Sequence, residues 1–134
     1  MIVADVNLVA YLLIEGEHTE ASQSVLARDP EWAAPLLWRS EWRNVLAGYL
    51  RRGQLELSEV MERLALAEAL LRGREFAVES ERVMELVHRS SLSAYDCEYV
   101  ALADQLGVPL VTNDARLVAA FPGRVVALGD FVEA

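Results

Sequence analysis

The sequence predicts a three-layer α/β sandwich, in which a short parallel sheet of four to five strands is flanked by helices. Short apolar segments alternate with longer helical patterns along the chain, and this alternation is typical of strand–helix units that build a parallel sheet. The short segments are apolar on both faces, as strands covered by helices on both sides are. A length of 134 residues suits one core, so we expect residues 1–134 to form a single domain.

The pattern of apolar residues and breakers gives the expected elements in chain order. They are a strand at 1–5, helices at 7–14 and 18–28, a strand at 31–34, helices at 36–52 and 58–71, a strand at 76–78, helices at 80–89 and 93–106, a strand at 109–111, a helix at 114–120 and a strand at 125–128. The helix at 36–52 is the clearest, because its apolar residues form one stripe at helical spacing. That stripe is Trp38, Trp42, Val45, Leu46 and Tyr49.

Capping residues and helix breakers set the expected boundaries. The expected N-caps, whose side chains accept from the first free amides, are Asn7, Ser58, Ser80 and Ser93. The expected stops are Asp29-Pro30, Gly53, Gly73 and Gly107.

Composition limits the function classes. The net charge is −9, with twelve arginines and no lysine, which argues against nucleic-acid binding through a broad basic patch. Cys97 is the only cysteine, and His18 and His88 lie far apart, so a disulfide or a thiolate zinc site is not expected. No apolar run reaches membrane-spanning length, and the N-terminus does not read as a signal peptide. We therefore expect a cytoplasmic protein without a membrane partner.

Asp96 lies in an unexpected place within the segment SAYDCEYVALA. On a helical wheel with Asp96 at zero, Val100 falls near about 40° and Ala103 near about 340°, whereas Glu98 falls near about 200°. Asp96 is therefore predicted to face the protein and Glu98 the solvent. Glu41 lies at the border of the buried stripe on its own helix.

Asp5, Glu41, Asp96 and Asp114 together indicate a metal site. Asp5 and Asp114 follow predicted strands, and crevices in parallel sheets lie beyond the carboxyl ends of the strands. Each acid alone also has a structural explanation, as a helix cap, as a charge in a first helical turn or as the partner of an arginine. Clustered carboxylates repel each other unless a cation neutralises them, and all-oxygen ligands suit Mg²⁺ or Mn²⁺. Such ions activate water for phosphodiester hydrolysis in many enzymes.

The chain resembles the PIN domain, and within it the VapC-type toxins of bacterial and archaeal toxin–antitoxin pairs. The resemblance rests on an apolar strand ending in Asp5-Val6-Asn7, followed in order by SEWRNVL, SAYDCEYVALA and LVTNDARL. It implies a PIN-like fold and a Mg²⁺- or Mn²⁺-dependent endoribonuclease. The positions that match the family's metal-binding acids are Asp5, Glu41, Asp96 and Asp114, and those that match its supporting residues are Asn7 and Thr112. Val6 and Cys97 replace commoner residues without changing the acids.

The resemblance also implies partners. Family members act on RNA, are often homodimers and are inhibited by a cognate antitoxin whose tail covers the site. The charge of −9 is compatible with a basic tail.

Two other functions stay open. Another metal-dependent α/β phosphohydrolase, such as a haloacid-dehalogenase-like phosphatase, would want a second aspartate where this chain has Asn7, and a lysine that it lacks. A PIN-like binding or scaffold module without catalysis is the second alternative, and metal binding would discriminate it.

Aromatic and basic residues near the acids have more than one interpretation. Trp38 and Trp42 lie on the apolar stripe, so we expect them in the core or a dimer interface rather than stacked on bases, for which Trp32 is also a candidate. The roles of Arg39, Arg43 and Arg116, as phosphate contacts or as solvated surface, are left open.

Overall fold

The protein forms a five-stranded sheet in the order β3-β2-β1-β4-β5, with every neighbouring pair parallel. The computed structural model describes residues 1–133. The strands are β1 (Ile2–Ala4), β2 (Trp32–Pro35), β3 (Glu75–Phe76), β4 (Leu110–Thr112) and β5 (Val125–Ala127). All residues of β1, β2 and β4 are buried. The predicted parallel sheet with apolar faces is therefore confirmed.

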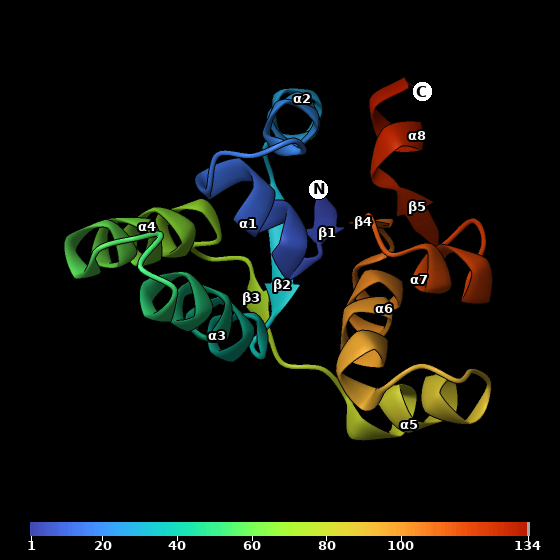
Figure 1. The fold of residues 1–134 in the computed structure, drawn as a ribbon. Helices are drawn as coiled ribbons and strands as arrows, with labels where there is room; N and C mark the ends of the chain where they lie inside the picture. Colours follow the sequence, from blue (N-terminus) through green and yellow to red (C-terminus); the bar gives the residue numbers. More distant parts are fainter. Residues whose placement is uncertain (134) are drawn as a thin grey trace.

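Helices cover both sides of the sheet, as Figure 1 shows, with the green helices on one side of the strands and the yellow and orange helices on the other. The helices are α1 (Val6–Leu13), α2 (Thr19–Arg28), α3 (Trp38–Arg51), α4 (Leu57–Leu70), α5 (Ser80–His88), α6 (Ala94–Leu106), α7 (Ala115–Ala120) and α8 (Leu128–Glu133). α6 packs on β1, β2 and β4, and α5 packs on α6. α1 packs against α2, α3 and α4. The predicted three-layer α/β fold is confirmed.

The three tryptophans lie in the core. Trp32, Trp38 and Trp42 are at most 1% exposed, and the indole N–H groups of Trp32 and Trp38 donate to the Asp29 carbonyl and the Glu75 carboxylate. Buried indoles stabilise through their large apolar area and usually need such an acceptor. The prediction that Trp38 and Trp42 lie in the core is confirmed, and none of the three tryptophans is exposed for stacking on bases.

Several helix starts differ from the expectation by one or two residues. Asp5, not Asn7, caps α1, because its carboxylate at the strand end reaches the Asn7 amide. Glu56, not Ser58, begins α4 through a reciprocal capping box with Glu59.

The remaining boundaries agree with the expectation in part. Ser80 is the first residue of α5 rather than its cap. Ser93, by contrast, caps α6 as expected, and Gly107 ends α6 with a φ of 66°. The last strand ends at Ala127, and α8, which was not expected, follows directly.

No helix among residues 1–133 is both long enough and apolar enough to cross a membrane.

Candidate metal centre

Asp5 is held at the carboxyl end of β1 by the neighbouring strand. The parallel register pairs Val3 with Leu110 and Ala4 with Val111, so the next step along places Asp5 beside Thr112. The Thr112 hydroxyl donates to Asp5 Oδ2 at 2.6 Å, and the Asn7 amide donates to Asp5 Oδ1 at 3.3 Å. Thr112 Oγ1 also accepts from the Asp114 amide at 3.0 Å. One buried hydroxyl therefore fixes Asp5 and the backbone that leads to Asp114.

Glu41 is positioned by a tyrosine from another helix. Glu41 lies in the first turn of α3, and the Tyr99 hydroxyl on α6 donates to Glu41 Oε1 at 2.6 Å. Tyr99 is only 4% exposed, and its phenol stays protonated because burial and the Glu41 charge both raise its pKa. A neutral hydroxyl thus orients Glu41, as Thr112 orients Asp5.

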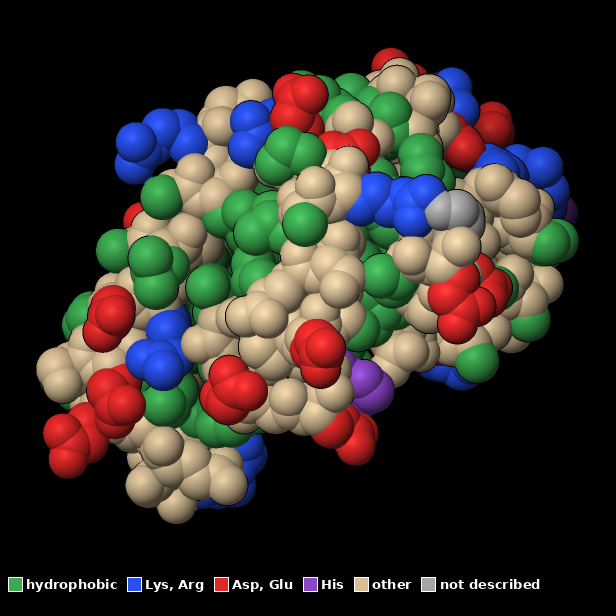
Figure 2. Space-filling view, turned by 90° about the horizontal axis from the view of Figure 1, so that it is seen from above, with side chains coloured by type: hydrophobic (Ala, Val, Ile, Leu, Met, Phe, Trp, Pro, Cys, Tyr) green, Lys and Arg blue, Asp and Glu red, His purple; other side chains and the backbone are tan. Residues whose placement is uncertain are grey.

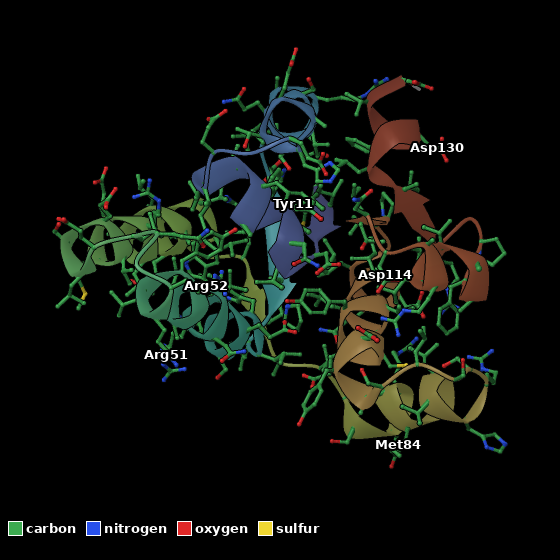
Figure 3. All side chains as sticks on the ribbon, in the orientation of Figure 1. Tyr11, Arg51, Arg52, Met84, Asp114 and Asp130 are labelled. Atoms are coloured by element: carbon green, nitrogen blue, oxygen red, sulfur yellow. The ribbon has the colours of Figure 1, made fainter. Side chains whose placement is uncertain are left out.

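Asp96 and Asp114 are joined by a basic residue. Arg116 Nη2 lies 2.7 Å from Asp114 Oδ2 and 3.7 Å from Asp96 Oδ2. Arg116 Nε and the Arg116 amide both donate to Asp114 Oδ1, at 3.2 and 2.9 Å. Asp114 also caps α7. In Figure 3 the labelled Asp114 lies where β4, α6 and α7 meet.

The four acids influence each other electrostatically. Burial raises the pKa of Asp5, and the charges of Asp96 and Asp114 raise it further, against the hydrogen bonds from Thr112 and Asn7. Burial also raises the pKa of Glu41, as do the charges of Asp5 and Asp96, whereas the Tyr99 hydrogen bond opposes the rise. Because each effect requires proximity, the acids from β1, α3, α6 and the start of α7 lie around one region. The pKa of Asp114 is lowered, chiefly by its hydrogen bond from Arg116.

The family model of the PIN domain matches residues 2–121. The chain belongs to the PIN domain family. It is also similar to Ribonuclease VapC3 from Pyrobaculum aerophilum, with 29% identity over 127 residues that cover 92% of this chain and 97% of the relative.

Solved structures share the fold of this PIN domain. A crystal structure of PAE2754 from Pyrobaculum aerophilum matches with a TM-score of 0.76 and 18% identity, covering 98% of this chain and 86% of the other. A toxin–antitoxin complex from Klebsiella pneumoniae contains a chain with a TM-score of 0.70 and 21% identity, covering 96% and 98%. FitAcB from Neisseria gonorrhoeae contains one with a TM-score of 0.64 and 19% identity, covering 95% and 96%.

The acids of the PIN domain approach each other without forming a closed ligand cage. Within residues 1–133, no group of three or more acidic, histidine or cysteine side chains is arranged to hold a metal ion as it stands. Arg116 lies against Asp96 and Asp114, where its charge offsets part of their mutual repulsion. The chemistry of the donor set, which consists of carboxylate oxygens alone, fits Mg²⁺ or Mn²⁺. The role of these acids as metal ligands stays a prediction.

The exposure of two side chains on α6 differs from what the helical wheel predicted. Asp96 is 28% exposed at its side chain, so it lies at the rim of the buried face rather than within it. Glu98, expected in solvent, is partly buried, and burial raises its pKa. The reason is that α6 is a core helix with buried residues around most of its circumference, namely Cys97, Tyr99, Val100, Ala101, Leu102 and Ala103. Glu41 is half-buried, as its border position predicted.

Two residues near the acids have roles that the sequence left open or missed. The Asn7 side chain is exposed, and Asn7 supports Asp5 through its backbone N–H. The apolar pattern of its helix did not indicate the role of Tyr99. A buried tyrosine usually needs a hydrogen-bond partner for its hydroxyl, and Glu41 is that partner.

The arginines near the acids differ from each other. Arg39 is engaged elsewhere, because it binds Glu75 through two nitrogens and Glu68 through a third. Arg43 is exposed and points to a different side of α3 from Glu41, which lies two positions before it. Arg116 contacts the candidate site directly.

Proposed function

We propose that this PIN domain is a Mg²⁺- or Mn²⁺-dependent endoribonuclease that hydrolyses RNA phosphodiester bonds, and that it is the toxin of a toxin–antitoxin pair. The observation that carries the proposal is the approach of Asp5, Glu41, Asp96 and Asp114 at the carboxyl ends of β1 and β4. The similarity to a protein named Ribonuclease VapC3 across nearly the whole chain supports an activity on RNA.

In the proposed mechanism the four acids hold the divalent ion or ions. A bound Mg²⁺ or Mn²⁺ supplies an activated water and stabilises the charge that develops on the phosphoryl group. Thr112 donates to Asp5 Oδ2 and Tyr99 donates to Glu41 Oε1, and these bonds restrict how the two carboxylates can turn. Such outer hydrogen bonds orient ligands and tune a metal site.

The raised pKa values support the same conclusion. Without a cation, folding brings Asp5 and Glu41 into a region where their charges are opposed by burial and by neighbouring acids. Asp5 also caps α1, but a cap does not require this charge, because asparagine caps a helix about as well as aspartate. We take this cost as support for metal binding and against the scaffold alternative.

The test is cleavage of a mixed pool of structured RNAs, transfer RNA included, with Mn²⁺, with Mg²⁺ and with chelator. Wild type is compared with Asp96→Asn and with Asp130→Asn, which removes the same charge from an exposed position on α8 (Figure 3). We expect metal-dependent cuts in wild type and Asp130→Asn and none in Asp96→Asn. Mn²⁺ binding is measured on the same proteins. If wild type neither cleaves RNA nor binds Mn²⁺ more tightly than Asp96→Asn, the scaffold function replaces the enzyme.

The proposal includes two protein partners. A groove of about 270 Å³ begins at Asn7, beside Asp5, and continues between α1 and α3 along Tyr11, Val45 and Tyr49. We propose that a cognate antitoxin segment uses such a surface next to the acids. That one neighbour in fold comes from a toxin–antitoxin complex is compatible with it.

A homodimer is the second proposed partner arrangement. Met84 on α5 is 57% exposed and lines a shallow hollow with Val83 on α5 and Ala94 on α6, so the two packed helices offer an apolar surface for a second copy. Sedimentation of wild type beside Met84→Glu tests this surface, because a buried charge would dissociate the dimer. A cytoplasmic location is part of the proposal, since RNA is the substrate.

A further inference from the structure

Arg116 occupies both oxygens of Asp114. Its Nη2 lies 2.7 Å from Oδ2, and its Nε lies 3.2 Å from Oδ1, so the guanidinium binds the carboxylate in a two-pronged fashion. The same Nη2 lies 3.7 Å from Asp96 Oδ2. One guanidinium thus neutralises two of the four acids. Asp5 and Glu41, by contrast, are held by neutral hydroxyl groups.

The Arg116 guanidinium is held by the two acids and lies otherwise in solvent. The side chain is 69% exposed, and every contact that the structure gives its guanidinium is to Asp96 or Asp114. Arg124 and Arg74, by contrast, are held by the fold. Arg124 pairs with Asp104, and Arg74 bonds to the carbonyls of Trp32 and Leu70.

The overall charge of the chain does not favour the approach of RNA. The chain has a net charge of −9, and Figure 2 shows acidic and basic side chains interspersed across the visible face. A polyanion approaching the acids therefore needs cations at the site itself. A divalent ion supplies one such charge, and an arginine released from the acids supplies another.

We propose that Arg116 exchanges partners when the site is loaded. It neutralises Asp96 and Asp114 while the divalent ion is absent, is displaced from them by the ion, and then contacts a phosphate of the RNA. This inference rests on the proposed function. It makes Arg116 a positioning residue for the metal-free acids and a binding residue for the substrate.

The exchange follows from charge and geometry. The guanidinium lies against both oxygens of Asp114, so a divalent ion bound to the same carboxylate would be repelled by its positive charge, and the two cations compete. An exposed ion pair is weak, which allows the ion to win. The planar guanidinium binds phosphate in the same two-pronged geometry as carboxylate. Removal of Arg116 should therefore have opposite effects on the affinity for metal and on the affinity for RNA.

The metal experiment compares wild type, Arg116→Gln, Arg116→Lys and Arg51→Gln by Mn²⁺ titration with electron paramagnetic resonance. Arg51→Gln removes the same charge from an exposed position at the end of α3, away from Asp114 (Figure 3). We expect Arg116→Gln to bind Mn²⁺ about two- to tenfold more tightly than Arg51→Gln, since a weak competing ion pair is lost. The Mn²⁺ affinity of Arg116→Lys should lie between those of Arg116→Gln and Arg51→Gln, because lysine keeps the charge but cannot contact both carboxylate oxygens in the two-pronged geometry.

The RNA experiment measures binding of a transfer RNA pool by fluorescence anisotropy with Ca²⁺ in place of Mn²⁺, and a gel taken at the end confirms that the RNA is intact. We expect Arg116→Gln to bind RNA about three- to tenfold more weakly than Arg51→Gln. The slope of log affinity against log salt concentration should fall by about 1 for the lost phosphate contact.

The outcomes separate this inference from the proposed function. Equal Mn²⁺ affinity in Arg116→Gln and Arg51→Gln overturns the exchange and leaves the nuclease proposal standing. Tighter Mn²⁺ binding with unchanged RNA binding overturns the phosphate contact. Absence of Mn²⁺ binding in every protein, wild type included, overturns both proposals. Circular dichroism of each variant confirms that the fold is retained.

Discussion

Replacement of Tyr99 by phenylalanine removes one hydroxyl from the centre of the candidate site. The ring of Tyr99 is 4% exposed and stays packed in the variant, so the perturbation is confined to the 2.6 Å hydrogen bond to Glu41 Oε1. A hydrogen bond to a charged group contributes about 1.5–3 kcal/mol. Because Glu41 is only half-buried, water can partly replace the hydroxyl. We therefore expect the free energy of unfolding to fall by about 1.5 kcal/mol and the melting temperature by about 5 °C.

The loss should depend on pH in a defined direction. The Tyr99 hydrogen bond lowers the pKa of Glu41 against the larger effect of burial, which raises it. The bond favours the ionised carboxylate, so the stability difference is full above the pKa of Glu41. It shrinks as the pH falls through that pKa, because protonated Glu41 no longer needs the donor.

The assay combines thermal unfolding in chelator from pH 8 to pH 4 with Mn²⁺ titration. Tyr95→Phe is the matched control, because Tyr95 lies on the same helix and is 65% exposed. We expect Mn²⁺ affinity to fall about 10-fold in Tyr99→Phe, at the low end of the effect of outer hydrogen-bond partners, and to stay unchanged in Tyr95→Phe. Equal stability and equal Mn²⁺ affinity in the two variants would refute the reasoning.

Three other predictions follow from the same geometry. Thr112→Val removes the hydroxyl that joins Asp5 to the Asp114 amide, and Mn²⁺ titration should show an affinity about 10- to 100-fold lower. The pKa values of Asp5 and Glu41 are raised above their ordinary 3.8 and 4.5, so the folded state takes up protons before the unfolded state as the pH falls. Thermal unfolding in chelator should therefore show stability rising as the pH falls through the raised values. Saturating Mn²⁺, which favours the ionised acids, should reverse this trend. Gly107→Ala places a side chain at a φ of 66° with open space around it, so denaturant unfolding should show a loss of about 1–2 kcal/mol while Mn²⁺ affinity stays that of wild type.

Local patterns predicted the fold because the forces that set it are local or periodic. Apolar runs mark strands such as β4, whereas Ser93 and Gly107 mark the start and the end of α6. Backbone conformation and capping depend on only a few neighbouring residues. The errors also have local causes. Glu56 replaces Ser58 as a cap since its neighbour Glu59 completes a reciprocal bond, and several residues in one stretch can serve as caps.

The candidate site was predicted to a different extent for each of its parts. Asp5 and Thr112 could be placed together from the sequence, because parallel strands bring their carboxyl ends to one edge. The hydrogen bond between Tyr99 and Glu41 joins residues 58 positions apart on two different helices. The spacing of residues within one helix cannot predict such a contact. Arg39 and Arg116 flank similar acids in the sequence, yet one binds Glu75 and the other Asp114.

The sequence by itself determined the α/β class, the order of its elements, and which acids follow strands or begin helices, since these depend on backbone preferences and on the spacing of apolar residues. Only the tertiary structure decided which group contacts each acid. Hydroxyl groups hold Asp5 and Glu41, whereas an exposed arginine joins Asp96 and Asp114. The reason is that a charged side chain takes the nearest partner in space, and that partner is set by how α3, α6 and α7 pack around the ends of the strands.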